Sequence, residues 1–186
     1  EQRLKTEGIR SPVLVMQSNG GVVTADVAKR LPVQTLLSGP VGGTTAGVAI
    51  NHALESANRD GLICIDMGGT SFDVSMVVNE EAQVELESSI DGHDLLFPSV
   101  AIHTVGAGGG SVAEEVAGGL RVGPRSAGAI PGPACYGRGG SEPTVTDANL
   151  LLGRLSINAR LCGDLELDSG KAKKAVAAVG QEIHME

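Results

Sequence analysis

The stretch that most constrains the fold of this chain is IDMGGTSFDV, residues 65–74. An apolar run ends in a carboxylate, two glycines and two hydroxyl residues follow, and the apolar pattern resumes around a second carboxylate. In order, these residues are Asp66, Gly68, Gly69, Thr70, Ser71 and Asp73. A carboxylate at the end of an apolar strand is costly unless a cation or hydrogen-bond donors compensate it. A glycine pair lets the backbone approach a ligand closely and present N–H groups to an anion.

Two interpretations of this stretch are open from the local sequence. In the first, the glycine amides and the hydroxyls of Thr70 and Ser71 hold phosphoryl oxygens, while Asp66 holds Mg²⁺ through water, since this cation keeps several of its waters. In the second, the stretch is an ordinary β-hairpin whose glycines serve the turn and whose acids are solvated. Both interpretations predict two strands joined by a tight turn.

The composition argues against several classes of partner. The chain of 186 residues has a formal net charge of −8, which argues against nucleic acid or an anionic membrane as the main partner. Aromatic residues make up 2% of the chain, so stacking platforms for single strands are missing. No apolar run approaches the roughly 18 residues that a membrane-spanning helix needs. We therefore expect no nucleic acid and no membrane among the partners.

The cysteines indicate the cellular compartment of the chain, and the first residue indicates whether the chain is a fragment. Cys64, Cys135 and Cys162 have no CxxC spacing, which favours a reducing compartment and hence the cytoplasm. The chain begins at Glu1, not at Met, and a strand pattern follows almost immediately. We therefore expect an excised fragment or a cleaved product.

Strand and helix patterns alternate along the chain, which predicts an α/β fold. Residues 12–23 turn at Asn19-Gly20-Gly21, as in a hairpin, and a short helix capped by Thr24 is expected before Pro32. The sequence then predicts a strand, an SGPVGG loop and a helix from about Thr44 to Ala57. Further strands are expected at residues 62–69, 72–78, 82–90 and 100–106, and a helix at 170–180.

Residues 106–140 differ in character from the rest of the chain. They contain 12 glycines and 3 prolines in 35 residues, a density at which disorder becomes plausible. We nevertheless expect this segment to be ordered in the main, because Cys135 and Tyr136 stand among its glycines and it runs directly into a helix with Thr146 or Asp147 as N-cap. Gly108 and Gly109 lie either against a nucleotide or in a purely structural loop.

Three further residues have competing interpretations. Cys135 could act as a nucleophile, but no partner base is identifiable, which favours a structural role. His103 could ligate a metal or contact substrate, or it could be a hydrogen-bonded structural histidine. Asp147 is expected to cap the following helix, with ordering of a loop or a site role as the alternative. A P-loop, HExxH, CxxC pairs and GxSxG are absent.

Four stretches of the chain closely resemble the hydantoinase A/5-oxoprolinase family. They are SGPVGG, DMGGTSFDVS, IHTVGAGGGSVA and GPRSAGAIPGPACYGRGGSEPTVTDANLLLGRL, and the resemblance extends over residues 12–168. That family includes ATP-dependent N-methylhydantoinases, 5-oxoprolinases and nucleotide-binding subunits of acetone and acetophenone carboxylases. The resemblance implies an actin-like (ribonuclease H-like) ATPase architecture, a mixed sheet with flanking helices, in a larger subunit whose two lobes face each other across ATP. In such folds an acid followed by a glycine turn occurs once per lobe, and DMGGTSFD resembles the second occurrence.

The resemblance also implies roles for individual residues. It favours Asp66 and Asp73 as catalytic residues: Asp66 holds Mg²⁺ through water, and Asp73 assists the metal or a water, with anchoring of the turn as the alternative. It assigns ATP binding to Gly68, Gly69, Thr70, Ser71, Gly108 and Gly109. Residues 1–60 are expected to form a leading strand–helix part, 61–105 the strands of the phosphate turn, 106–142 a glycine-rich loop region and 143–186 the C-terminal helices.

The chemistry implied by the resemblance is ATP-dependent phosphorylation of a carbonyl oxygen. The expected function is a part of an amidohydrolase subunit that opens a hydantoin or 5-oxoproline-type cyclic amide or imide, with a second hydantoinase-type subunit as partner. A ketone carboxylase subunit and a non-catalytic assembly fragment are the alternatives. Because the first phosphate turn of the family is missing, we expect this segment alone to be inactive. Ala101, Arg125 and Ile130 stand where family members often carry acids, so no role is carried over to those positions.

Overall fold

The chain forms two compact units in a computed structural model that describes residues 1–53, 61–90, 92–158, 163 and 165–184. The first unit contains residues 1–66 and 73–103, and the second contains residues 67–72 and 104–186. Helices and strands occur in both, so the α/β prediction is confirmed for the segment. Among the described residues, no helix combines the length and the apolar character that crossing a membrane requires.

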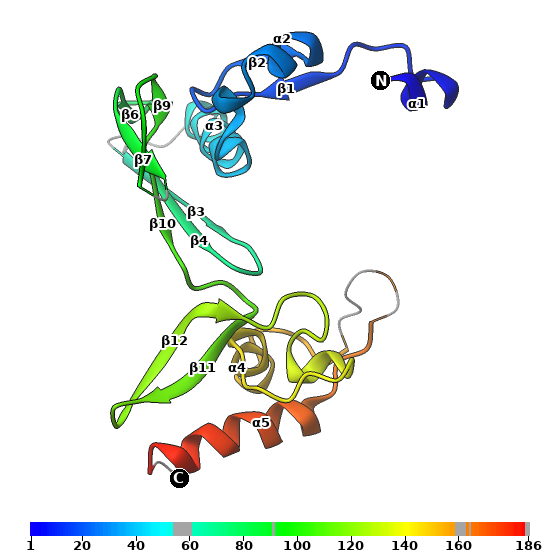
Figure 1. Cartoon of the computed structure of the whole chain (residues 1–186), viewed down its shortest axis with the longest axis vertical. Coiled ribbons are helices and arrows are strands. Elements are labelled where there is room, and N and C mark those ends of the chain that lie inside the picture. Colours follow the sequence, from blue (N-terminus) through cyan, green and yellow to red (C-terminus); the bar gives the residue numbers. More distant parts are fainter. Residues whose placement is uncertain (54–60, 91, 159–162, 164, 185–186) are drawn as a thin grey trace. The chain divides into compact units, whose positions relative to one another are not determined.

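The first unit holds four helices among its described residues and most of the strands (Figure 1). The helices are α1 (Gln2–Thr6), α2 (Ala25–Arg30), the 3₁₀ helix η1 (Pro32–Thr35) and α3 (Ser38–Ala53). The strands are β1 (Leu14–Met16), β2 (Val22–Thr24), β3 (Gly61–Met67), β4 (Phe72–Val78), β5 (Glu81–Ala82), β6 (Val84–Glu85), β7 (Ser88–Ile90), β8 (His93–Leu95), β9 (Ser99–Val100) and β10 (Ile102–Val105). The last residue of β3, the first of β4 and the end of β10 are counted with the second unit.

The predicted hairpin and short helix near the N-terminus are confirmed. Strands β1 and β2 pair antiparallel around a turn in which Gly20 has φ +87° and the Asn19 side chain accepts from the Gly21 amide at 2.9 Å. Helix α2 begins after Thr24 and ends at Arg30, because Leu31 precedes a proline and is held outside the helical region. Thr24 occupies the N-cap position, but its side chain makes no capping hydrogen bond.

The predicted SGPVGG loop is wrong, because α3 already begins at Ser38 and these residues form its first turns. Pro40 is tolerated there, since the first N–H groups of a helix have no intrahelical partner. Further along, α3 lies close to β3: a Cβ on Gly47 would lie 2.5 Å from the Cys64 Sγ atom. The predicted helix end at Ala57 lies outside the described residues.

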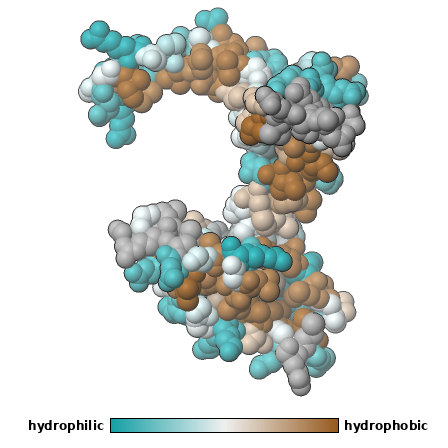
Figure 2. Space-filling model, turned by 180° about the vertical axis from the view of Figure 1, so that it is seen from behind, coloured by the Kyte–Doolittle hydropathy of each residue, from teal (hydrophilic) through white to brown (hydrophobic). Residues whose placement is uncertain are grey.

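Strands β3 and β4 form the predicted hairpin within a sheet of order β10–β4–β3, and β5 pairs with β4. On β3, Leu62 and Cys64 approach α3, while Ile63 and Ile65 on the opposite face are 64% and 62% exposed. Figure 2 shows the hydrophobic surface over these strands. Within the described part of the chain, the outer edge of β3 pairs with no strand.

The strand predicted over residues 82–90 is divided among three partners. Strand β5 pairs with β4, β6 pairs with β9, and β7 pairs with β8. The β4–β5 turn passes through Asn79 and Glu80, both at positive φ. The apolar pattern predicted strand conformation correctly, but it did not predict where the strand changes partner.

The second unit contains β11 (Ser111–Val116), β12 (Gly119–Ser126), the 3₁₀ helix η2 (Ala134–Tyr136), α4 (Val145–Leu151) and α5 (Ser169–Glu182). Strands β11 and β12 pair antiparallel, and α4 and α5 pack against β11 and against each other (Figure 1). The buried core contains Cys135, Leu150, Leu167 and Ala172. Residues 106–140 thus form two strands and a 3₁₀ helix, as expected of an ordered segment.

Candidate functional site

The tip of the β3–β4 hairpin is bonded to the glycine loop that follows β10. The Gly68 amide donates to the Ser71 carbonyl at 3.0 Å, which closes the turn. The Gly109 amide donates to the Gly68 carbonyl at 2.9 Å, and the Gly110 amide donates to the Gly69 carbonyl at 2.7 Å. These hydrogen bonds join two glycine stretches, about 40 residues apart in the sequence, into one continuous wall.

Gly108 lies where these two stretches meet. A Cβ on Gly108 would lie 2.5 Å from the Thr70 nitrogen and 2.7 Å from the Gly68 carbonyl oxygen. Real Cβ atoms do not approach backbone this closely, so the packing requires glycine here. On the other side of the loop, Thr146 in the first turn of α4 donates to the Gly109 carbonyl from its amide at 2.8 Å and from its hydroxyl at 2.7 Å.

This wall borders a cavity of about 670 Å³ that is lined only by residues of the second unit. Its volume lies within the range of small-molecule sites. Of the residues predicted to bind a nucleotide, Gly68, Gly69, Thr70 and Gly109 line it. Gly108 and Ser71 lie outside the lining, and they fix the wall through the close packing and the turn hydrogen bond described above.

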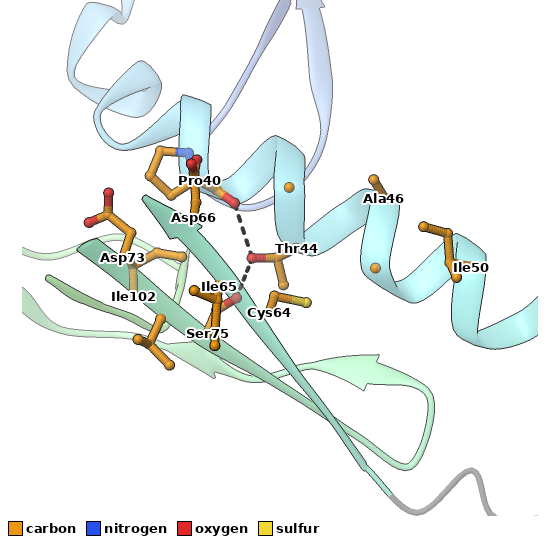
Figure 3. A pocket seen from close by; sticks show the side chains of 13 residues that line it. Pro40, Thr44, Ala46, Ile50, Cys64, Ile65, Asp66, Asp73, Ser75 and Ile102 are labelled. Atoms are coloured by element: carbon orange, nitrogen blue, oxygen red, sulfur yellow. Dashed lines mark hydrogen bonds between the residues drawn. The ribbon is translucent and has the colours of Figure 1, made fainter. Parts of the chain in front are cut away.

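The two predicted catalytic carboxylates, Asp66 and Asp73, line a different cavity of about 220 Å³ in the first unit (Figure 3). Asp66 is exposed and Asp73 is 9% exposed. Both lie near Pro40 in the first turn of α3 (Figure 3). The Thr44 hydroxyl, 3.1 Å from the Pro40 carbonyl and 2.6 Å from the Ser75 hydroxyl, joins α3 to β4 beside them. Among the described residues, no group of three or more His, Cys, Asp or Glu side chains is arranged to hold a metal.

Asp147 is fully buried and connects α4 to the glycine-rich segment. Its carboxylate accepts from the Cys135 amide at 2.7 Å, the Ala134 amide at 3.3 Å, the Thr144 amide at 2.9 Å and the Thr144 hydroxyl at 2.7 Å. The N-cap of α4 is Thr144, so the prediction of Thr146 or Asp147 as N-cap is wrong. Asp147 instead completes a capping box from the third helical position, and it also orders the loop.

Cys135 is fully buried beside Asp147. Burial raises the pKa of the Cys135 thiol to about 12, and the neighbouring Asp147 carboxylate adds to the rise. A thiol with so high a pKa supplies little thiolate at neutral pH, which argues against a role as nucleophile. His103 is exposed on β10 and lies outside both cavity linings.

We expect Cys135→Ser to leave turnover by the intact subunit within about twofold of wild type, because a thiol with so high a pKa supplies no thiolate. The measurement is steady-state turnover beside a thermal unfolding curve. A large loss of rate with an unchanged unfolding curve would show that the sulfur takes part in the chemistry.

Sequence reasoning missed three polar side chains in the lining of the larger cavity, Tyr136, Arg138 and Thr146. Tyr136 and Arg138 lie within the glycine-rich segment, and Thr146 lies at the start of α4. A cationic residue among glycines in an acidic chain is the signal that could have drawn attention to Arg138.

The whole chain, residues 1–186, matches the family model described as hydantoinase/oxoprolinase. It is 41% identical over 170 residues to the caprolactamase subunit alpha of Pseudomonas jessenii, an alignment that covers 91% of this chain and 24% of that protein.

Two solved structures are also similar over the whole chain. A structure of the ATP-dependent caprolactamase from Pseudomonas jessenii has a TM-score of 0.77 at 36% identity, and this chain covers 27% of it. A nucleotide-free structure of acetone carboxylase, described with the mechanism of ATP-dependent acetone carboxylation, has a TM-score of 0.85 at 28% identity, with 26% covered. This chain thus spans about a quarter of the length of these relatives. It belongs to the hydantoinase/oxoprolinase family, as the resemblance of its motifs predicted.

Proposed function

We propose that this chain is part of an ATP-dependent subunit that opens a hydantoin or 5-oxoproline-type cyclic amide by phosphorylation of its carbonyl oxygen. The observation that carries the proposal is the wall of two glycine stretches, residues 68–70 and 108–110, bonded together along a cavity of about 670 Å³. Such a wall suits phosphoryl transfer, which asks a protein mainly for positioning and for neutralisation of charge. The ATP-dependent caprolactamase, similar over the whole chain, supports a cyclic amide as the substrate class.

In this proposal the larger cavity holds the phosphates of ATP. Gly68, Gly69, Thr70 and Gly109 would contact them, because glycine backbone without side chains permits close approach. Ser71 and Gly108 would not contact the phosphates. They fix the turn that carries the contacting residues.

Mg²⁺ fits the pair of carboxylates in the smaller cavity. Asp66 and Asp73 bring hard oxygen ligands to one cavity, and Mg²⁺ is commonly held by one or two carboxylates together with waters. The exposed Asp66 would hold the hydrated ion through water, and Asp73, 9% exposed, would add a second carboxylate. When bound, Mg²⁺ neutralises the charge that develops on phosphoryl oxygens.

We also propose that the complete subunit has two actin-like lobes and that this chain supplies the phosphate turn of one. Two observations support this. The chain spans about a quarter of its relatives, and, in the described part of the chain, β3 has an unpaired edge and exposes Ile63 and Ile65 on one face. Turnover is therefore assigned to the intact subunit together with a second hydantoinase-type subunit, not to this segment alone.

A ketone carboxylase subunit is the second candidate. The observation in its favour is the TM-score of 0.85 to acetone carboxylase, higher than the 0.77 to caprolactamase. Sequence identity points the other way, at 28% against 36%. Identity weighs more on the substrate class, because a fold is shared by proteins of different function.

The dependence of ADP release on substrate distinguishes the two reactions from each other and from a third possibility, a non-catalytic assembly role. The intact subunit with its partner is incubated with MgATP and either hydantoin and 5-oxoproline or acetone with bicarbonate. The proposal expects ADP release that depends on the cyclic amide, with ring-opened product in proportion. ADP release that depends on ketone and bicarbonate would establish the carboxylase instead, and no stimulated release with any substrate would favour the assembly role.

We expect Asp66→Asn in the intact subunit to lower ATP-dependent turnover by at least about 100-fold, because the neutral amide is a poorer partner for hydrated Mg²⁺. The expected loss is partly restored by raising the Mg²⁺ concentration. Asp94→Asn, an exposed substitution on β8 outside the cavity, is the matched control. Wild-type turnover by a folded Asp66→Asn variant would remove Asp66 from the site.

A further inference from the structure

The lining of the larger cavity carries charge of one sign. Its residues include the glycines of both stretches, the polar residues Thr70, Tyr136 and Thr146, and a single charged residue, Arg138. No carboxylate belongs to this lining, although the chain as a whole has a formal charge of −8. A cavity with this composition favours an anionic ligand.

The backbone just before Arg138 is anchored by hydrogen bonds. Gly137 and Gly139 flank it at φ +67° and +100°, conformations that favour glycine. The Gly137 amide donates to the Ala134 carbonyl at 3.2 Å, and the neighbouring Cys135 amide donates to buried Asp147 at 2.7 Å. Arg138 therefore starts from a fixed point at the cavity wall.

Among the residues that the structure describes, the guanidinium of Arg138 has no carboxylate partner. Arg125 is paired with Glu114 at 3.0 Å and Glu142 at 2.8 Å, and Arg121 is paired with Glu114. Within the described ranges of the chain, Arg138 makes no such ion pair. A guanidinium without a carboxylate partner keeps its planar set of donors free for a ligand.

We propose that Arg138 binds phosphoryl oxygens of the nucleotide in this cavity, whose lining also contains glycine backbone that can approach the same group closely. This inference rests on the proposed function, since it assigns ATP to the same cavity. Phosphate is favoured because the glycine wall, without side chains, permits close approach of the ligand, and because the guanidinium fork matches phosphate oxygens bidentately. Arg138 is thus a binding residue for the polyphosphate part of ATP and not for its nucleoside part.

The test compares the binding of ATP and of adenosine to the intact subunit by calorimetry. We expect Arg138→Gln to weaken ATP binding by about 10- to 100-fold, the effect of one lost charge-assisted hydrogen-bonding partner, and to leave adenosine affinity unchanged. Arg138→Lys should lie between the two, because it keeps the charge and loses the fork. Arg154→Gln is the matched control, since Arg154 is exposed and lies outside the lining.

The outcomes separate this inference from the proposed function. Unchanged ATP affinity in Arg138→Gln, with wild type binding ATP, overturns the role of Arg138 and leaves the proposed function standing. An equal loss for ATP and adenosine also overturns it, because the residue would then act on the fold or on the nucleoside. No ATP binding by wild type overturns both. If Arg138→Gln is misfolded by circular dichroism, the folded Arg138→Lys variant decides, and wild-type ATP affinity in it counts against bidentate phosphate binding.

Discussion

Gly108→Ala should lower ATP turnover by the intact subunit by about 100-fold or more, because small displacements of positioning groups have effects of this size. The added methyl would lie 2.5 Å from the Thr70 nitrogen and 2.6 Å from the Gly69 carbonyl carbon. These are backbone atoms and cannot rotate away, so the turn of residues 68–71 must move. Overpacking of this kind also lowers the free energy of unfolding by about 1–3 kcal/mol.

Gly119→Ala is the control for the Gly108 substitution. Gly119 begins β12 in the same unit, and an added Cβ would be 3.7 Å from the Val116 carbonyl, an ordinary contact. We expect its turnover and urea unfolding curve to match wild type. Normal turnover by Gly108→Ala would show that the contact between the two glycine stretches is not needed for the reaction.

Asp147→Ala should lower the free energy of unfolding of the second unit by at least about 3 kcal/mol, because each buried donor left without a partner costs about 1–3 kcal/mol. The substitution leaves the amides of Ala134, Cys135 and Thr144 without their acceptor. Urea unfolding measures the loss, and hydrogen exchange at these three amides locates it. Because Asp147 fixes both the loop and the start of α4, exchange should increase at both places together.

Asp168→Ala is the comparison for Asp147. Asp168 also caps a helix, since it accepts from the Lys171 amide at 3.0 Å, but its side chain is 46% exposed and water can replace it. We expect a much smaller effect on unfolding. Equal effects of the two substitutions would mean that burial of Asp147 adds nothing to its capping role.

Local patterns predicted the elements whose formation depends on neighbours in sequence. The hairpins at residues 14–24 and 61–78 and helix α5 were predicted because turn residues and apolar periodicity lie within one short window. The start of α3 was missed because Pro40 and its neighbouring glycines indicate a loop when read locally. A proline in the first turn removes no hydrogen bond, so the helix begins six residues before the predicted Thr44.

The candidate site shows the same limit. The acid and glycine turn at residues 66–71 was found from sequence because one continuous stretch carries it. The docking of Gly68 and Gly69 against Gly109 and Gly110 depends on contacts about 40 positions apart, which no local pattern encodes. The division of the predicted residues between two cavities and the position of Arg138 in one of them follow from the same long-range packing.

The hairpin tip at residues 67–72 has a consequence for any attempt to isolate the second unit. This unit is discontinuous in sequence, since the chain enters it at residue 67, leaves it after residue 72 and returns at Thr104. A shortened chain that starts at Thr104 would lack the Gly68 and Gly69 carbonyls that accept from the loop amides. Limited proteolysis within β10 would cut the chain once, but the two fragments would stay bound to each other through the hydrogen bonds of the hairpin tip. The second unit is thus inseparable by a single cleavage. Because chains are made from the N-terminus, the tip is synthesised more than thirty residues before Thr104 and has to wait for the rest of its unit.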